Sequence, residues 1–129
     1  GMSNLEQMRD NIAAMADFEG LGDEGRAVLD TARQKLAEIP LIPCTTCNYC
    51  AKVCPMDIGV SGTFTGMNYL TIYGDKDAAL RQEGWLVGKH GHKRATECIG
   101  CGACERACPQ HIAIRSELAR CVEALGIEG

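Results

Sequence analysis

The sequence predicts a mainly α-helical protein in which one structural unit is used twice. Three observations lead to this prediction. Apolar residues recur with helical period in several segments, no stretch alternates apolar and polar residues as a half-buried strand does, and the chain matches itself when shifted by 54 positions. A chain of 129 residues has room for only a modest hydrophobic core. We therefore expect something besides apolar burial to stabilise the fold.

Five segments have the pattern of amphipathic helices. We expect helices over 4–16, from Asp23 to a point before Pro40, over 60–73, over 76–82 after a cap at Asp75, and over 114–125 with Gly126 as the stop. Ser3 and Glu6 have the spacing of a capping box for the first helix. Gly62 and Gly66 weaken the third prediction. Residues 40–43 are expected to be an extended segment that leads into the first cysteine motif.

Four cysteines and a proline define the internal repeat. The first copy contains Cys44, Cys47, Cys50, Cys54 and Pro55, and the second contains Cys98, Cys101, Cys104, Cys108 and Pro109. The match continues beyond the cysteines, because Ile58 falls on Ile112 and Val60 falls on Ile114. Each copy is therefore expected to pass from a cysteine-rich loop into a helix.

The spacing within each copy, C-x2-C-x2-C-x3-C-P, is that of bacterial proteins with two [4Fe-4S] clusters. Three closely spaced thiolates surround one cluster, and the fourth, which we expect on a departing helix, binds the other cluster. We therefore predict two [4Fe-4S] clusters as cofactors. The first is assigned to Cys44, Cys47, Cys50 and Cys108, and the second to Cys98, Cys101, Cys104 and Cys54. Gly100 and Gly102 should allow the backbone to approach the second cluster.

Zinc is the main alternative to iron and sulfide, since paired C-x2-C motifs also form zinc sites with four thiolates. A third cysteine at the same short interval followed by C-P is not expected in such a site. Disulfides fit less well, because cysteines so close together in a loop are badly oriented for pairing. Cys121 is the ninth cysteine and lies on the apolar side of the last predicted helix, so we expect it in the core.

Composition and charge exclude several classes of function. The formal net charge of -4 disfavours nucleic acid as a partner, because phosphate binding needs clustered Lys and Arg. No apolar run approaches the roughly 18 residues of a membrane span, and residues 3–17 do not have the pattern of a signal peptide. Eight of the nine cysteines are assigned as metal ligands, which indicates a reducing compartment, so we expect a cytoplasmic location.

The motifs predict electron transfer through two clusters, and we identify no catalytic residues in the chain. A structural or redox-sensing role of the clusters is a second hypothesis, and a zinc-binding interaction domain is a third. We expect residues 1–43 to form a helical N-terminal extension and residues 44–129 to form the dicluster domain.

Residues 55–97, between the two motifs, are mostly helical by pattern, and in this respect the chain resembles the α-helical ferredoxin fold. More closely, it is similar to the C-terminal part of iron-sulfur-containing aldo/keto reductase family proteins. That resemblance rests on CTTCNYCAKVCP from Cys44, CIGCGACERACPQ from Cys98, and Asn68 and Tyr73-Gly74 between them. Residues 1–19 resemble the last loop and helix of that family's barrel, where the cofactor phosphate binds, with Ser3 and Asn11 as the clearest matches.

The resemblance implies a redox partner, either an aldo/keto reductase barrel or a flavoprotein. A barrel of this type needs about 250 residues, and its Asp, Tyr, Lys and His tetrad is not found in this sequence. We therefore expect the chain to be one domain of a longer protein, with any hydride transfer assigned to the partner.

Overall fold

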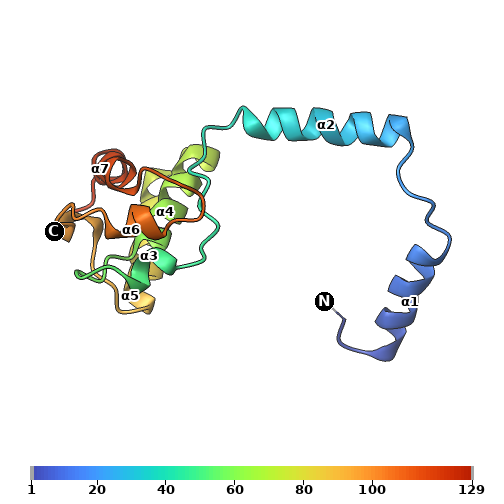
Figure 1. The fold of residues 1–129 in the computed structure, drawn as a ribbon, viewed down its shortest axis with the longest axis horizontal. Coiled ribbons are helices and arrows are strands. Elements are labelled where there is room, and N and C mark those ends of the chain that lie inside the picture. The colour runs from blue at the N-terminus through green and yellow to red at the C-terminus, as the bar shows by residue number, and fades with distance from the viewer. Residues whose placement is uncertain (1, 129) are drawn as a thin grey trace. The chain divides into compact units, whose positions relative to one another are not determined.

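The computed structural model describes residues 2–128 and divides the chain into two compact units, Gly1–Glu38 and Ile39–Gly129 (Figure 1). Within the described residues there are helices and turns but no strand, apart from one isolated bridge between Ile58 and Lys93. The predicted mainly helical fold class is confirmed. Within 2–128, every helix is too short or too polar to cross a lipid bilayer.

The first unit contains α1 (Leu5–Ala16) and α2 (Asp23–Ala37), close to the predicted ranges. The cap of α1 differs from the predicted pair of Ser3 and Glu6. Asn4 is the capping residue, and its Oδ1 accepts from the backbone N–H of Gln7 at 2.9 Å. The Gln7 side chain accepts in turn from the Ser3 N–H at 2.7 Å. The N-cap is therefore one residue later than predicted, and the Gln7 side chain bonds to the N–H of Ser3 instead of to that of the capping residue Asn4.

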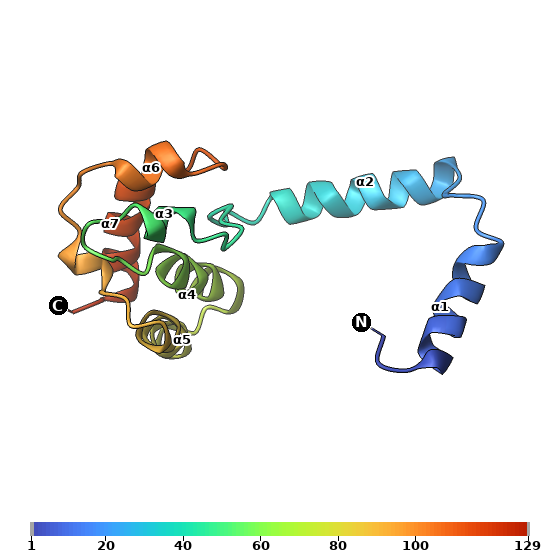
Figure 2. The ribbon, with the colours of Figure 1, turned by 60° about the horizontal axis from the view of Figure 1, so that its bottom comes forward.

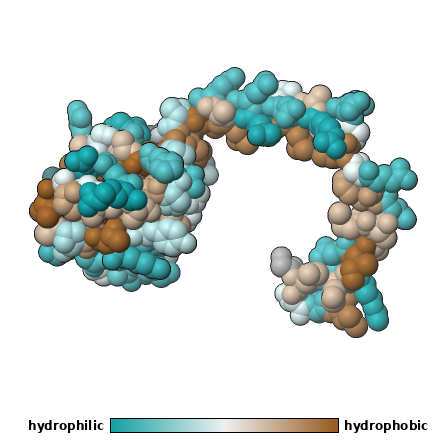
Figure 3. Space-filling view, viewed as in Figure 1, coloured by the Kyte–Doolittle hydropathy of each residue, from teal (hydrophilic) through white to brown (hydrophobic). Residues whose placement is uncertain are grey.

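None of the side chains described in this unit is buried. Both helices are amphipathic, and Figure 3 shows apolar and polar side chains on different sides of α2. The exposed apolar side chains of the two helices include Leu5, Ile12, Leu29 and Leu36. Residues 2–38 thus form helices without forming a hydrophobic core of their own.

The second unit contains the remaining elements. They are α3 (Tyr49–Lys52), α4 (Val60–Tyr73), α5 (Lys76–Lys89), the 3-10 turn η1 (Ala95–Glu97), α6 (Ala103–Ala107) and α7 (Ile114–Leu125). The predictions for α4 and α7 are confirmed, and Gly126 ends α7 with a positive φ of 69°. Asp75 caps α5 as predicted, but the helix continues past Gln82 to Lys89. The predicted end was wrong because Gly84 and Gly88 are tolerated within this helix.

Helix α4 lies at the centre of this unit and packs against α5 and α7 (Figure 2). The core is formed by residues with little or no exposed surface, among them Ile58, Phe64, Ile114, Leu118, Cys121 and Leu125. Cys121 is fully buried, as predicted for a core position, and burial raises the pKa of its thiol to about 12.

Two glycines allow α4 and α5 to approach closely. A Cβ atom at Gly66 would lie 2.7 Å from Cβ of Glu83, and one at Gly62 would lie 3.0 Å from Cγ2 of Val87. These are the glycines that weakened the helix prediction. They lie one helical turn apart on the side of α4 that contacts α5. Glycine lowers the stability of an isolated helix, but at these two positions it allows α5 to pack closely against α4.

The internal repeat is visible in the backbone. Helices α3 and α6 begin 54 residues apart and pack side by side in both ribbon views, and α4 and α7 also begin 54 residues apart (Figures 1 and 2). Three pairs of equivalent residues have positive φ: Thr46 and Gly100, Asn48 and Gly102, Asp57 and His111. Both copies therefore have the same loop conformation despite different residue types.

The fourth cysteine of each motif is not helical, contrary to our expectation. α3 ends at Lys52 and α6 at Ala107, so Cys54 and Cys108 lie in the segments that follow. In each copy the backbone N–H of this cysteine donates to a carbonyl three residues earlier, at 3.3 Å. The helix is too short to include the fourth cysteine, and the turn that follows directs it away from its own loop.

Candidate metal centre

Cysteines from both repeats line one cavity. Three come from the first motif, Cys44, Cys47 and Cys50, and the fourth is Cys108 from the second motif. Most of the other lining residues are apolar, and Phe64 is one of them. The structure therefore brings together the four residues that were assigned to the first cluster.

A second cavity is lined by the other four motif cysteines. Cys98, Cys101 and Cys104 come from the second motif, and Cys54 comes from the first. Val60, at the start of α4, lines both cavities. The two cavities are thus neighbours on either side of one residue.

The linings of the two cavities correspond residue by residue. Each residue of the second cavity has its repeat equivalent, 54 positions away, in the lining of the first. Equivalent cysteines also have the same exposure: Cys50 and Cys104 are buried, whereas Cys47 and Cys101 are exposed. The site is therefore one local structure formed twice.

Burial makes three of the motif thiols weaker acids than an exposed cysteine. Burial raises the pKa of Cys44 and Cys104, and it raises the pKa of Cys50 to about 11. Backbone N–H groups oppose this effect, those of Thr46 at Cys44 and of Ala51 at Cys50. Iron binding requires thiolates, so loading of the sites releases protons.

The donor set fits [4Fe-4S] clusters. Four cysteine sulfurs surround an otherwise largely apolar cavity, and the Ile58 N–H donates to the Cys54 sulfur at 3.4 Å. N–H bonds to sulfur are a usual way in which proteins tune such clusters. Gly100 and Gly102 have φ values of 70° and 72°, which bring the backbone of the second loop around the site.

A single zinc ion is the alternative to a cluster at these cysteines. A zinc ion needs its four sulfurs at about 2.3 Å. Across residues 2–128, no three His, Cys, Asp or Glu groups come together at a distance suited to a single ion.

Fold and site together define a helical protein with two [4Fe-4S] clusters. The sequence pattern of the 4Fe-4S dicluster domain matches residues 43–113, more than half of the chain, and the chain belongs to this family. Neither a curated protein nor a solved structure matches the chain significantly. The family match supports electron transfer by two iron-sulfur clusters and implies a redox partner, and it does not specify the enzyme that the domain serves.

Sequence reasoning missed several polar residues beside the cavities. Asn48 and Ser61 line the first cavity, and Arg115 lines the second. Ser61 and Arg115 occupy equivalent positions of the repeat, so alignment of the two copies beyond the cysteines would have identified them.

Proposed function

We propose that the chain passes electrons, one at a time, between two [4Fe-4S] clusters and a redox partner. Cys44, Cys47, Cys50 and Cys108 hold the first cluster in this proposal, and Cys98, Cys101, Cys104 and Cys54 hold the second. The observation that carries the proposal is the lining of the two cavities by these two sets of cysteines. When bound, each cluster accepts or donates a single electron.

The surroundings of the cavities are suited to electron transfer. Buried apolar residues of α4 and α7 limit the access of water, while the exposed Cys47 and Cys101 lie at the surface of their sites. Val60 lies in the lining of both cavities, so an electron passing between the clusters has a short path through the protein.

We further propose that the partner is the barrel of an aldo/keto-reductase-type oxidoreductase. Support comes from the two motifs, Asn68 and residues 73–74, together with the likeness of residues 1–19 to the last loop and helix of such a barrel. In this proposal residues 1–43 are the extension that joins barrel and dicluster domain. The unburied apolar side chains of α1 and α2 are consistent with packing against another domain. Thiolate ligation of iron also fits a reducing, cytoplasmic location.

The chain prepared without oxygen tests the proposal. We expect about eight iron and eight sulfide per chain, and reversible reduction by a chemical reductant with electrons returned to a one-electron acceptor. NADPH with a panel of aldehydes should give no turnover, because the chain has neither the hydride carrier's site nor the tetrad. Aldehyde reduction by this chain alone would contradict the assignment.

The alternative functions give different outcomes in the same experiment. A redox-sensing cluster would be lost during oxidation and reduction cycles, whereas a carrier keeps its iron. A structural cluster would keep its iron but would not be reduced at accessible potentials. Zinc in place of iron would indicate an interaction domain.

A further inference from the structure

The two cavities are matched position by position, so their differences fall on pairs of equivalent residues. Some pairs exchange one apolar residue for another. The pairs in which at least one member is polar or charged are Thr45 and Ile99, Asn48 and Gly102, Ser61 and Arg115, and Gln110 and Met56. One of these exchanges introduces a permanent charge. Arg115 is, apart from the cysteines, the single ionisable residue in either lining.

Glu105 fixes the position of the Arg115 side chain. Its Oε2 accepts from Nε of Arg115 at 3.0 Å and lies 2.9 Å from Nη2, while Oε1 accepts from the Arg115 backbone N–H at 2.9 Å. Nη1 of Arg115 donates to the carbonyl oxygen of Gly100 at 3.4 Å. Nη1 carries two N–H groups, so one remains available to a sulfur in the cavity.

The backbone of the second loop leaves room for this arrangement. A Cβ atom at Gly102 would lie 3.6 Å from Cζ of Arg115, so the guanidinium packs directly over the loop between Gly100 and Gly102. A Cβ at this distance would make an ordinary contact, so it is the positive φ of 72° that favours glycine at position 102.

The equivalent place in the first cavity is neutral. Asn48 takes the position of Gly102, and its Oδ1 accepts from the Ser61 hydroxyl at 2.5 Å. The hydroxyl proton of Ser61 is thus used within the protein. The first cavity has neither a cation nor a free hydroxyl donor at this point.

Neighbouring charges also differ between the two sites. Lys52 and Arg106 are at equivalent positions of the repeat, but Lys52 Nζ lies 5.5 Å from the Tyr49 ring centroid, whereas a Cβ at Gly102 would lie 3.6 Å from Nη1 of Arg106. Arg106 thus adds to the positive charge beside the second loop. Glu105, whose equivalent is Ala51, offsets part of the Arg115 charge. Glu105 is not among the residues that line the cavity, whereas Arg115 is, so Arg115 brings its N–H donors to the site.

A positive charge and N–H donors beside an iron-sulfur cluster stabilise its reduced, more negative form. We propose that Arg115 makes the second cluster the more easily reduced of the two, so that the first electron resides on the cluster of Cys54, Cys98, Cys101 and Cys104. This proposal rests on the ligation given under the proposed function. Arg115 acts as a positioning and tuning residue for the direction of electron flow.

Redox titration of the fully loaded chain, followed by electron paramagnetic resonance, tests this proposal. Arg115→Gln should lower the higher of the two midpoint potentials and leave the lower one unchanged. We expect a change of about tenfold in the ratio of the two singly reduced forms, which is 59 mV for a one-electron couple. Ser61→Arg, which places a cation at the equivalent position, should raise the lower potential.

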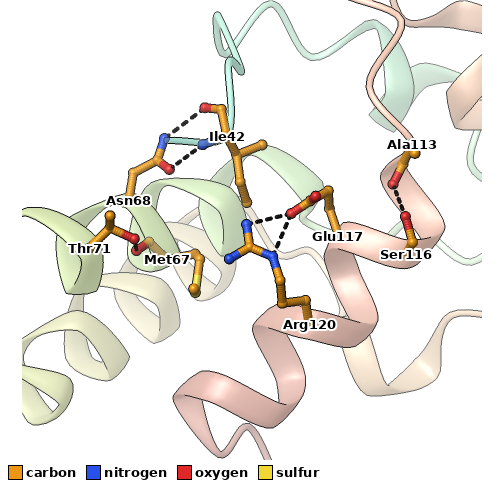
Figure 4. Close-up of polar contacts among 8 residues, drawn as sticks. All are labelled: Ile42, Met67, Asn68, Thr71, Ala113, Ser116, Glu117 and Arg120. Atoms are coloured by element: carbon orange, nitrogen blue, oxygen red, sulfur yellow. Dashed lines mark hydrogen bonds and ion pairs between the residues drawn. The ribbon is translucent and has the colours of Figure 1, made fainter. Parts of the chain in front are cut away.

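Two further variants serve as controls. Arg115→Lys keeps the charge and should retain most of the wild-type separation. Arg120→Gln removes a guanidinium from the same helix, where it pairs with Glu117 at 2.6 Å outside both cavities, and should change neither potential (Figure 4). Iron and sulfide contents equal to those of the wild type establish that each variant is loaded.

The outcomes separate this inference from the proposed function. Loaded, reversible clusters whose potentials do not respond to Arg115→Gln or Ser61→Arg would overturn the inference alone. The inference would also be overturned if Arg120→Gln lowered the higher midpoint potential as much as Arg115→Gln does. If Arg115→Gln does not take up its clusters, the Ser61→Arg variant decides: an unchanged lower midpoint potential in that variant would overturn the inference. Absence of reversible iron-sulfur reduction in the wild type would instead overturn the proposed function.

Discussion

The side-chain amide of Asn68 forms two hydrogen bonds with the backbone of Ile42, as a neighbouring peptide would (Figure 4). Its Nδ2 donates to the Ile42 carbonyl at 2.9 Å, and its Oδ1 accepts from the Ile42 N–H at 2.8 Å. Helix α4 thereby holds the segment that leads into Cys44. Ile42 itself is 3% exposed, and its carbonyl also accepts from the Cys44 N–H at 2.8 Å.

Replacement of Asn68 should loosen the first cysteine loop. Asn68→Ala removes both bonds, at about 1 kcal/mol for each. It leaves the Ile42 N–H unpaired, while the Ile42 carbonyl keeps the bond from the Cys44 N–H. We expect a holo protein destabilised by about 2 kcal/mol that loses one cluster faster than the other on exposure to a chelator. Visible absorbance and iron release measure this. Ser116→Ala, which removes an exposed bond to Ala113 on α7, is the control and should behave like the wild type.

The crossed arrangement of the cysteines predicts where a fourth-ligand variant acts. Cys54→Ser should damage the cluster of Cys98, Cys101 and Cys104, and Cys108→Ser should damage the other one. Combination with Arg115→Gln identifies the surviving cluster, because its potential responds to Arg115 only in the Cys108 variant. Cys121→Ala should keep the full iron content, since Cys121 lies in the core outside both cavities. A Cys54 variant whose remaining potential still responds to Arg115 would show that ligation does not cross.

The contact between α4 and α5 predicts opposite effects at two helical glycines. Gly66→Ala forces a Cβ against the Cβ of Glu83 at 2.7 Å, and overpacking of this kind costs about 1–3 kcal/mol. Gly88→Ala meets no atom within 4 Å and should stabilise α5 by up to about 1 kcal/mol. Denaturant midpoints of the holo proteins measure both. Equal effects of the two substitutions would contradict the packing argument.

Glu83 predicts a pH dependence of stability. It is fully buried, Thr63 donates to its Oε1 at 3.2 Å, and Oε2 has no partner among the residues the structure describes. Burial raises the pKa of Glu83 above its ordinary value of 4.5, although Arg94 and Thr63 oppose the shift. The native state therefore binds more protons than the unfolded state above pH 4.5, and stability falls as pH rises through the raised pKa.

Glu83→Gln should remove the loss of stability that accompanies ionisation of the buried carboxyl group. We expect the variant to be more stable than the wild type at neutral pH and its denaturant midpoint to vary less with pH above 4.5. Glu123→Gln, at an exposed position of α7, should follow the wild-type curve. A variant that becomes relatively less stable as pH rises would show instead that a charged Glu83 stabilises the fold through Arg94.

The sequence predicted what depends on pattern and missed what depends on tertiary contact. The repeat alone gave the starts of α4 and α7 at Val60 and Ile114, because the same turn precedes both helices. Helices α3 and α6 contain four and five residues, too few for an apolar period to appear. The end of α5 was missed because helix propensity counts Gly84 and Gly88 as breakers, whereas packing on α4 holds the helix together. Arg115 was missed because its role depends on the Glu105 side chain ten residues away.

The exchange of one cysteine between the two repeats bears on how the holo protein assembles. With the proposed ligation, insertion of either cluster ties together two loops that are distant along the chain, and it removes most of the conformational freedom of the remaining four thiols. The second insertion then meets a preformed site, so cluster incorporation should be cooperative. Limiting iron and sulfide should yield a mixture of full and empty chains, with few half-loaded ones, and native mass spectrometry would resolve the three forms.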